Sequence, residues 1–248
     1  MLNKIIHPFR TLRNRTFSKL FASQIASLLG DSFIWLGLAL ISYELNPTQS
    51  SSILAFALTM RVLAYILLSP FSGVVSDRFK RKNILLVTQL TRMLVVGLLL
   101  FVSAEWQLYV LVFLLNAAAA FYTPTYRAII PLIVDRREYR EANGLSMAVF
   151  QLLSVFGPAI AGIFSMWIGV KQLFMVSTAM LFLSFITIFS IPGDLIQNII
   201  TIGESDFKSR INSVTKGIHL LFGNKILWFS LSMEFVAAIA GALVLVNS

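Results

Sequence analysis

Ionisable side chains lie inside several long apolar stretches of this 248-residue chain, among them Asp31, Arg61 and Glu234. A charge within hydrocarbon is costly, so such residues usually face a protein interior or a water-filled cavity and mark ion or proton pathways. Burial disfavours a charged carboxylate whereas a neighbouring guanidinium favours it, so a carboxylate that leaves its arginine can exchange a proton. The three residues are therefore candidates for proton coupling, with Asp31 and Glu234 as the groups that would carry the proton.

Asp31 and Arg61 are expected to meet. They belong to the first two apolar stretches, which we expect to form adjacent antiparallel helices. At 1.5 Å per residue they lie about 16 and 12 Å from the same membrane face. One interpretation is that Asp31 separates from Arg61 and exchanges a proton when the protein changes conformation. The alternative is a permanent Asp31–Arg61 ion pair that only fixes helix packing.

Other polar residues suggest a cavity rather than an active site. Asn116 and Gln151 fall near the middle of apolar stretches and are candidates for lining a cavity. The chain has no cysteine and only two histidines, His7 and His219, which are far apart in sequence. No thiolate or histidine metal site is predicted from this. A membrane enzyme would need a cluster of catalytic side chains, and the sequence contains none, so we predict no enzyme activity, metal or cofactor.

The elements that position these residues follow from composition. Hydrophobic residues make up 57% of the chain and charged residues 12%, whereas about a quarter of the residues in soluble domains are charged. The apolar residues come in blocks of about 20, the length that a helix needs to cross about 30 Å of hydrocarbon. We predict an all-α polytopic membrane protein in the lipid bilayer of the plasma (inner) membrane. The seven blocks span residues 17–42, 53–75, 84–104, 106–128, 142–168, 171–192 and 226–246.

Charge distribution predicts the orientation of these helices. The formal net charge is +9, and 16 of the 20 basic residues lie at the amino-terminal end or on alternate connections between the apolar blocks. Loops on the cytoplasmic side are enriched in Lys and Arg. We therefore predict a cytoplasmic amino terminus. The basic character is explained by topology, so nucleic acid is not an expected partner.

The connection between the second and third blocks carries a motif, GVVSDRFKRK, at residues 73–82. It resembles the loop signature of the major facilitator superfamily, approximately G-x-x-x-D-R/K-x-G-R/K-R/K, with Lys80 in place of the second glycine. The resemblance extends over essentially the whole chain. The matching residues are Gly73, Asp77, Arg78, Arg81 and Lys82.

This resemblance implies a conformational latch. In the family, the glycine lets neighbouring helices approach closely. The aspartate, here Asp77, accepts hydrogen bonds from a helix amino terminus and from nearby arginines, and so stabilises the outward-open state. Arg127, expected at the cytoplasmic end of the fourth helix, is a further candidate member of the latch.

A second motif, GLSMAVFQLLSVFGPAIAG at residues 144–162, is similar to the antiporter signature of the same superfamily. A Gly-Pro pair bends a transmembrane helix, and small residues allow close helix packing. The match favours export, although a packing kink without bearing on transport direction is an equal alternative. Two other stretches, FYTPTYRAIIPLI at residues 121–133 and GDSFIWLG in the first apolar block, are similar to the branch of enterobactin exporters and macrolide-efflux proteins. The residues of the antiporter-like motif are Gly144, Gly157, Pro158, Ala161 and Gly162.

The expected organisation is a six-helix bundle at 1–192, a cytoplasmic amphipathic linker at 193–225 and a seventh helix at 226–248. Superfamily members have twelve helices in two halves, so a carboxy-terminal half is an implied partner and the chain is expected to be a fragment. The resemblance implies proton-coupled export of amphipathic small molecules, drugs or a siderophore, by alternating access. The alternative is a truncated, non-transporting membrane protein or scaffold.

Overall fold

The computed structural model describes residues 11–136, 138–193, 228–229 and 232–233, and for Asp77 the backbone only. The predicted linker from residue 194 onward, most of the predicted seventh helix and Glu234 lie outside these residues. The chain divides into two compact units, 1–200 and 201–248. The functional residues that can be placed all belong to the first unit.

The first unit is a bundle of helices, as the sequence predicts. Six of the described helices are long and apolar enough to cross a membrane, and they coincide with the first six apolar blocks. Because the connections between them are short, successive helices run in opposite directions. A short 3-10 helix, Thr11–Arg13, precedes them. The six are α3 (Arg15–Leu45), α4 (Ser50–Arg78), α5 (Arg81–Leu99), α6 (Glu105–Ile133), α7 (Tyr139–Ser165) and α8 (Val170–Phe189).

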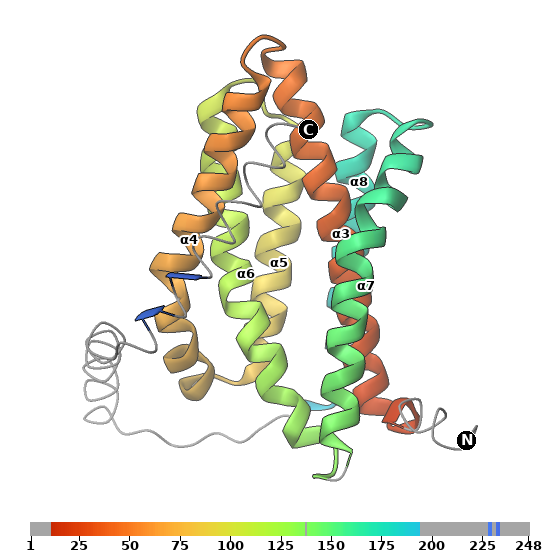
Figure 1. Cartoon of the computed structure of the whole chain (residues 1–248). Coiled ribbons are helices and arrows are strands. Elements are labelled where there is room, and N and C mark those ends of the chain that lie inside the picture. Colours follow the sequence, from red (N-terminus) through yellow and green to blue (C-terminus); the bar gives the residue numbers. More distant parts are fainter. Residues whose placement is uncertain (1–10, 137, 194–227, 230–231, 234–248) are drawn as a thin grey trace. The chain divides into compact units, whose positions relative to one another are not determined.

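Helices distant in sequence lie side by side in the bundle (Figure 1). α3 packs against α8 and α7, α5 packs against α6 and α8, and α4 packs along α6. We call the end at which α3, α5 and α7 begin the amino-terminal end of the bundle. α3 is the most buried of the six helices, whereas α4 and α7 leave most of their surface outside the core.

The two larger of the three apolar clusters in the described core lie on either side of a polar layer. The cluster nearer the amino-terminal end includes Phe17 and Leu20 of α3, together with residues of α5, α6, α7 and α8. The cluster nearer the opposite end includes Leu38 of α3 and Phe174 of α8, together with residues of α4, α5 and α6. Asp31 lies on α3 between these clusters. The core is therefore interrupted at the depth where the charged residues are found.

Close contact between α3 and α8 depends on small residues. A Cβ atom at Gly37 would lie 2.9 Å from the ring of Phe174, and one at Gly30 would lie 3.3 Å from the carbonyl oxygen of Ser177. In membrane proteins, small residues at helix interfaces allow such approaches. This packing fixes the helix that carries Asp31 against α8.

Polar side chains join the helix ends at the amino-terminal end of the bundle. The Asn14 side-chain oxygen accepts hydrogen bonds from the backbone of Thr16 and Phe17, at 3.0 and 3.3 Å, and so caps α3. Its side-chain nitrogen donates to the carbonyl oxygen of Ile133, the last residue of α6, at 2.6 Å. One residue thus satisfies backbone groups at the start of α3 and at the end of α6.

Candidate functional site

A cavity of about 520 Å³ opens within the first unit and is lined by residues of α3, α4, α5, α6 and α7. Its wall combines aromatic and apolar side chains with a few charged ones. The aromatic contributions include Trp35, Tyr65 and Phe150. The charged residues that line it are Asp31, Arg61, Arg92 and Arg127.

Asp31 forms an ion pair with Arg92 of α5, through its Oδ1 and the arginine Nη2. The expected pairing of Asp31 with Arg61 is therefore wrong. The Arg92 side chain is only 2% exposed, whereas the Asp31 side chain is 35% exposed, because it borders the cavity. The pair joins α3 to α5, and only its acidic member remains accessible.

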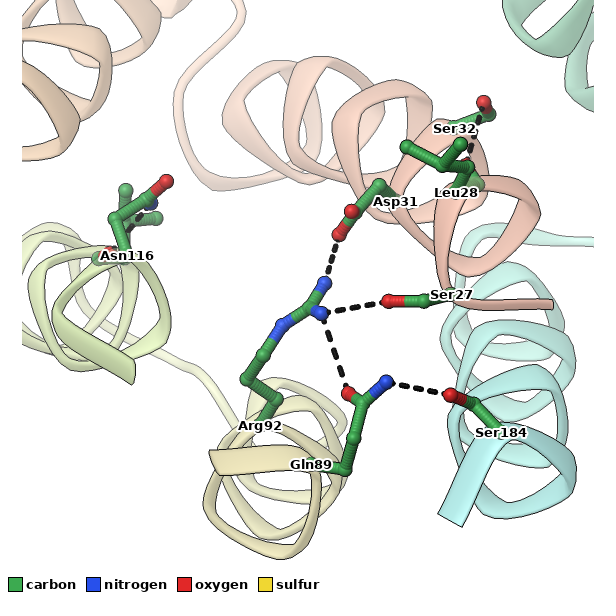
Figure 2. Close-up of polar contacts among 9 residues, drawn as sticks. Ser27, Leu28, Asp31, Ser32, Gln89, Arg92, Asn116 and Ser184 are labelled. Carbon is green, nitrogen blue, oxygen red and sulfur yellow. Dashed lines mark hydrogen bonds and ion pairs between the residues drawn. The ribbon is translucent and has the colours of Figure 1, made fainter. Parts of the chain in front are cut away.

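Arg92 belongs to a buried network of side chains (Figure 2). Its Nη1 donates to the hydroxyl of Ser27 at 2.8 Å and to Oε1 of Gln89 at 3.2 Å. The Gln89 amide nitrogen in turn donates to the hydroxyl of Ser184 of α8 at 2.6 Å. These partners are all buried. A buried charge requires such compensation, and here it ties three helices together at one depth.

The sequence contained a signal for this network that the prediction did not use. Gln89 and Arg92 are three residues apart in a largely apolar stretch, so they lie on the same face of α5. A pair of strongly polar residues on one helical face within a membrane span indicates burial against polar partners. The prediction paired Asp31 with a residue of the next helix in sequence, α4. The long Arg92 side chain reaches Asp31 of α3 from α5 instead.

Arg61 has a different partner. Its guanidinium carbon lies 4.4 Å from the centre of the Trp35 ring, over the indole. Trp35 is one helical turn beyond Asp31 on α3. Arg61 is therefore close to the Asp31–Arg92 pair without belonging to it, and it lines the cavity.

The two predicted cavity residues differ in their positions. Asn116 lines the cavity, is buried, and donates a hydrogen bond from Nδ2 to the carbonyl oxygen of Val112 at 2.8 Å. Gln151 is exposed and does not line the cavity. The α7 residues that do, such as Met147, Phe150 and Ser154, form a helical stripe, and Gln151 lies to the side of it.

A second polar cluster, not predicted from the sequence, borders the cavity nearer the amino-terminal end. The Tyr126 hydroxyl of α6 donates to Oε1 of Gln24 at 2.6 Å, and it lies 3.2 Å from the Ser146 hydroxyl. The Gln24 amide nitrogen donates to the Ser146 carbonyl oxygen at 3.2 Å. These bonds join α3, α6 and α7 beside the cavity.

Gly157 of the antiporter-like motif makes the tightest glycine contact in the described bundle. A Cβ atom there would lie 2.9 Å from Cβ of Ser32, and closer still to the Ser32 hydroxyl. Pro158 lines the cavity, and α7 remains helical through it. The Gly-Pro pair thus places α7 directly against the residue that follows Asp31.

The other motif residues of α7 are not equivalent. Ala161 is fully buried in a cluster with Phe33 of α3 and Leu173 of α8. A Cβ atom at Gly144 or Gly162 would meet no described atom within 4 Å beyond its own helix. Helix packing accounts for Gly157 and Ala161, whereas Gly144 and Gly162 have no packing role in this part of the chain.

The loop motif connects α4 to α5, but the structure does not test its latch because the Asp77 side chain lies outside the described residues. Gly73 is exposed, and a Cβ atom there would meet no described atom within 4 Å. The close helix approach expected at Gly73 is therefore not found in the described part of the chain. Arg78 lies at the end of α4, with its guanidinium carbon 5.9 Å from the centre of the Phe79 ring. Arg127 lines the cavity.

Two further basic residues of the motif bind backbone carbonyl groups of other helices. Arg81 donates from Nη1 to the carbonyl oxygen of Ala128 in α6 at 3.0 Å. Lys82 donates from Nζ to the carbonyl oxygens of Phe189 and Ile191, at 2.9 and 2.6 Å. Because helix carboxy-terminal ends carry partial negative charge, a cation such as Lys82 stabilises the end of α8. Together the two residues hold the start of α5 against α6 and the end of α8.

Known proteins are similar to this chain in sequence over part of their length. Uncharacterized MFS-type transporter YfiS of Bacillus subtilis (strain 168) is 29% identical over 210 residues, which cover 82% of this chain and 48% of that protein. Macrolide efflux protein A of Streptococcus pyogenes is 27% identical over 157 residues, which cover 61% and 38%. Lysophospholipid transporter LplT of Serratia proteamaculans (strain 568) is 29% identical over 157 residues, which cover 63% and 38%.

A solved structure is similar to this chain in fold, again over part of its length. The crystal structure of the human organic anion transporter MFSD10 (TETRAN) superposes with a TM-score of 0.61 at 13% identity, covering 79% of this chain and 52% of that one. The chain therefore spans about half, or less, of the length of these proteins. The family model of the Major Facilitator Superfamily matches residues 20–248. The chain belongs to the Major Facilitator Superfamily.

Proposed function

We propose that this chain is the amino-terminal half of an exporter of amphipathic small molecules, which works by alternating access together with a carboxy-terminal half. In this proposal the amino-terminal end of the bundle faces the cytoplasm, in agreement with the distribution of basic residues. Support comes from family membership and from relatives named as a macrolide efflux protein and a lysophospholipid transporter. Both names refer to compounds with polar and apolar parts.

The observation that carries the proposal is the composition of the cavity wall. Small-molecule sites are concave and mostly apolar, with a few placed polar groups, and typically enclose about 300–1,000 Å³. This cavity, at about 520 Å³, has aromatic side chains such as Trp35 and Phe150 beside the charges of Asp31 and Arg61. An amphipathic compound could use both kinds of surface.

Asp31 is the proposed proton carrier. Its accessible carboxylate meets a buried guanidinium, Arg92, across the α3–α5 interface. Movement of α3 relative to α5 would separate the two groups, and a carboxylate without its counter-charge in a membrane interior favours the protonated form. Re-forming the pair would release the proton. Glu234 remains a second candidate, outside the described residues.

Export by the complete transporter, measured in everted membrane vesicles, tests both parts of the proposal. A macrolide and an anionic lysophospholipid are offered in separate assays, with and without a protonophore, and export of either one supports the exporter proposal. We expect the protonophore to abolish uphill export. Asp31→Asn should abolish pH-driven export while leaving downhill movement, because the neutral amide cannot exchange a proton.

Asp135→Asn is the matched control, since Asp135 is exposed in the α6–α7 connection and does not line the cavity. It should export as the parent does. Export that is unchanged by the protonophore in both the parent and Asp31→Asn would refute proton coupling. Absence of any export would favour the alternative of a non-transporting membrane protein.

A further inference from the structure

The charges that line the cavity do not balance. Among the described residues, three guanidinium groups and one carboxylate contribute to its wall. Arg92 and Asp31 form an ion pair with each other. The other two, Arg61 and Arg127, are exposed and have no ion pair or side-chain hydrogen bond with any residue that the structure describes. The described wall therefore carries two positive charges without counter-charge.

Arg61 is oriented rather than free. Its guanidinium lies over the Trp35 ring at 4.4 Å, an arrangement that is favourable for a cation. The contact occupies one face of the planar group and leaves its N–H donors available at the edge. Guanidinium donors arranged in this way match the two oxygens of a carboxylate or phosphate.

We propose that Arg61 is an anion-binding subsite and that the compound bound in this cavity is an anionic amphiphile. Its carboxylate, sulfate or phosphate group binds the free edge of the Arg61 guanidinium. The inference deepens the proposed export function, on which it rests, by stating the charge of the substrate.

The subsite follows from the cost of an isolated charge. A cation at membrane depth requires a counter-charge or access to water. The single negative charge of Asp31 is already paired with Arg92, and the described wall contains no second carboxylate to balance Arg61. A cationic substrate would meet Arg61 and Arg127 without a free carboxylate in the described wall, whereas an anionic one supplies the absent counter-charge.

The rest of the wall suits the apolar part of such a compound. Tyr65 lies one turn along α4 from Arg61 and lines the cavity. Met147 and Phe150 of α7 line it as well. Apolar surface beside a single oriented cation is the complement of a molecule with one anionic head and one hydrophobic body.

Equilibrium binding of two matched probes tests the proposal. Octyl phosphate and octyltrimethylammonium share a tail and differ in the charge of the head. Each is titrated calorimetrically into the full 248-residue chain in nanodiscs of zwitterionic lipid, with empty nanodiscs as the blank. We expect octyl phosphate to bind at least about tenfold more tightly, as is typical of a hydrogen bond between charged groups. Arg61→Gln should lose this preference, and Arg61→Lys should keep part of it.

Arg140→Gln is the matched control, because Arg140 is exposed in the first turn of α7 and does not line the cavity. It removes the same charge and should keep the preference. A melting temperature of Arg61→Gln equal to that of the parent would show that its fold is retained. Equal binding of the two probes by the parent would overturn the proposal, and is expected if a carboxylate outside the described residues neutralises Arg61.

Three further outcomes are decisive. A phosphate preference that survives Arg61→Gln and disappears in Arg127→Gln would overturn the assignment to Arg61. Binding and export can also fail separately. Octyl phosphate bound through Arg61 by a protein that exports nothing would uphold the subsite and refute the proposed function. Proton-driven export by a protein without the phosphate preference would uphold the proposed function and refute the subsite.

Discussion

Arg92 and Arg61 line the same cavity, yet their surroundings differ. Arg92 is 2% exposed and binds Asp31, Ser27 and Gln89. Arg61 is exposed, and its described contact is the face of Trp35. Arg92 has the environment of a structural or switching group, because its charge is paired with Asp31. Position in an apolar stretch therefore does not determine how a membrane-embedded charge is compensated. This difference is the basis of the different roles proposed for Arg92 and Arg61.

The largest expected effect comes from removing the counter-charge of the buried arginine. Asp31→Leu leaves Arg92 buried without its anion, and breaking such a pair typically costs about 3–5 kcal/mol. Arg61→Leu removes an exposed cation and its aromatic contact, which should cost less than about 1 kcal/mol. Thermal unfolding of the detergent-solubilised chain measures both. Equal losses of stability for the two variants would break the comparison between the arginines.

Removing Arg92 instead of Asp31 tests how strongly each member of the ion pair is desolvated. Arg92→Leu leaves Asp31 unpaired, but the Asp31 side chain is 35% exposed at the cavity and can be hydrated. The cost should be about 2–3 kcal/mol, below the range for a fully buried partner.

The same unfolding assay measures this asymmetry. A double variant, Asp31→Leu with Arg92→Leu, should lose less stability than the two single variants added together, because both charges are then absent. Additive losses would show that the pair contributes no coupling. A larger loss for Arg92→Leu than for Asp31→Leu would show that Asp31 is the more strongly desolvated group.

A third, smaller effect concerns the packing that holds Asp31 in place. Gly157→Ala introduces a Cβ atom 2.9 Å from that of Ser32, the residue that follows Asp31. Overpacking typically costs about 1–3 kcal/mol, and replacing a helical glycine by alanine recovers up to about 1 kcal/mol. We expect a net loss of about 1–2 kcal/mol in the stability of the chain.

Gly144→Ala provides the matched control on the same helix, since a Cβ atom there would meet no described atom within 4 Å. It should leave stability unchanged or raise it by up to about 1 kcal/mol. Similar losses for Gly157→Ala and Gly144→Ala would mean that α7 is not held at Ser32.

The sequence allowed the fold class and the helices to be predicted, because blocks of about 20 apolar residues admit one structure in hydrocarbon. The charged residues of the site were also recognisable as unusual, since charges in such blocks are rare. The pairing of Asp31 was not predictable from adjacency. It depends on which helices pack together, and α3 packs mainly on α8 and α7, helices distant in sequence.

The contacts of the motif glycines were also not fully predictable from the sequence. The sequence placed Gly157 in a small-residue pattern, and its contact with Ser32 agrees with the packing expected of that pattern. The loop motif predicted a close helix approach at Gly73 as well, yet a Cβ atom there would meet no described atom within 4 Å. Whether a glycine is packed depends on what faces it, and the sequence of one helix does not contain that information.

The smallest expected effect extends the comparison from guanidinium groups to lysines at the amino-terminal end of the bundle. Lys82 donates hydrogen bonds to the carbonyl oxygens of Phe189 and Ile191 at the end of α8. A cation in this position typically contributes about 0.3–1 kcal/mol. Lys82→Met should therefore lower the stability of the chain by about 0.5–1 kcal/mol in the same unfolding assay.

Lys80, two residues earlier, offers a nearly isosteric control. Its side chain is exposed and makes no capping hydrogen bond, although the residue itself occupies the N-cap position of α5. Lys80→Met removes the same charge from the same connection, so both variants change the charge asymmetry across the membrane equally. A loss confined to Lys82→Met would assign the effect to the α8 carbonyl oxygens. Equal losses for the two variants would instead assign the effect to the net positive charge of the connection. The hydrogen bonds of Lys82 would then contribute nothing measurable beyond its charge.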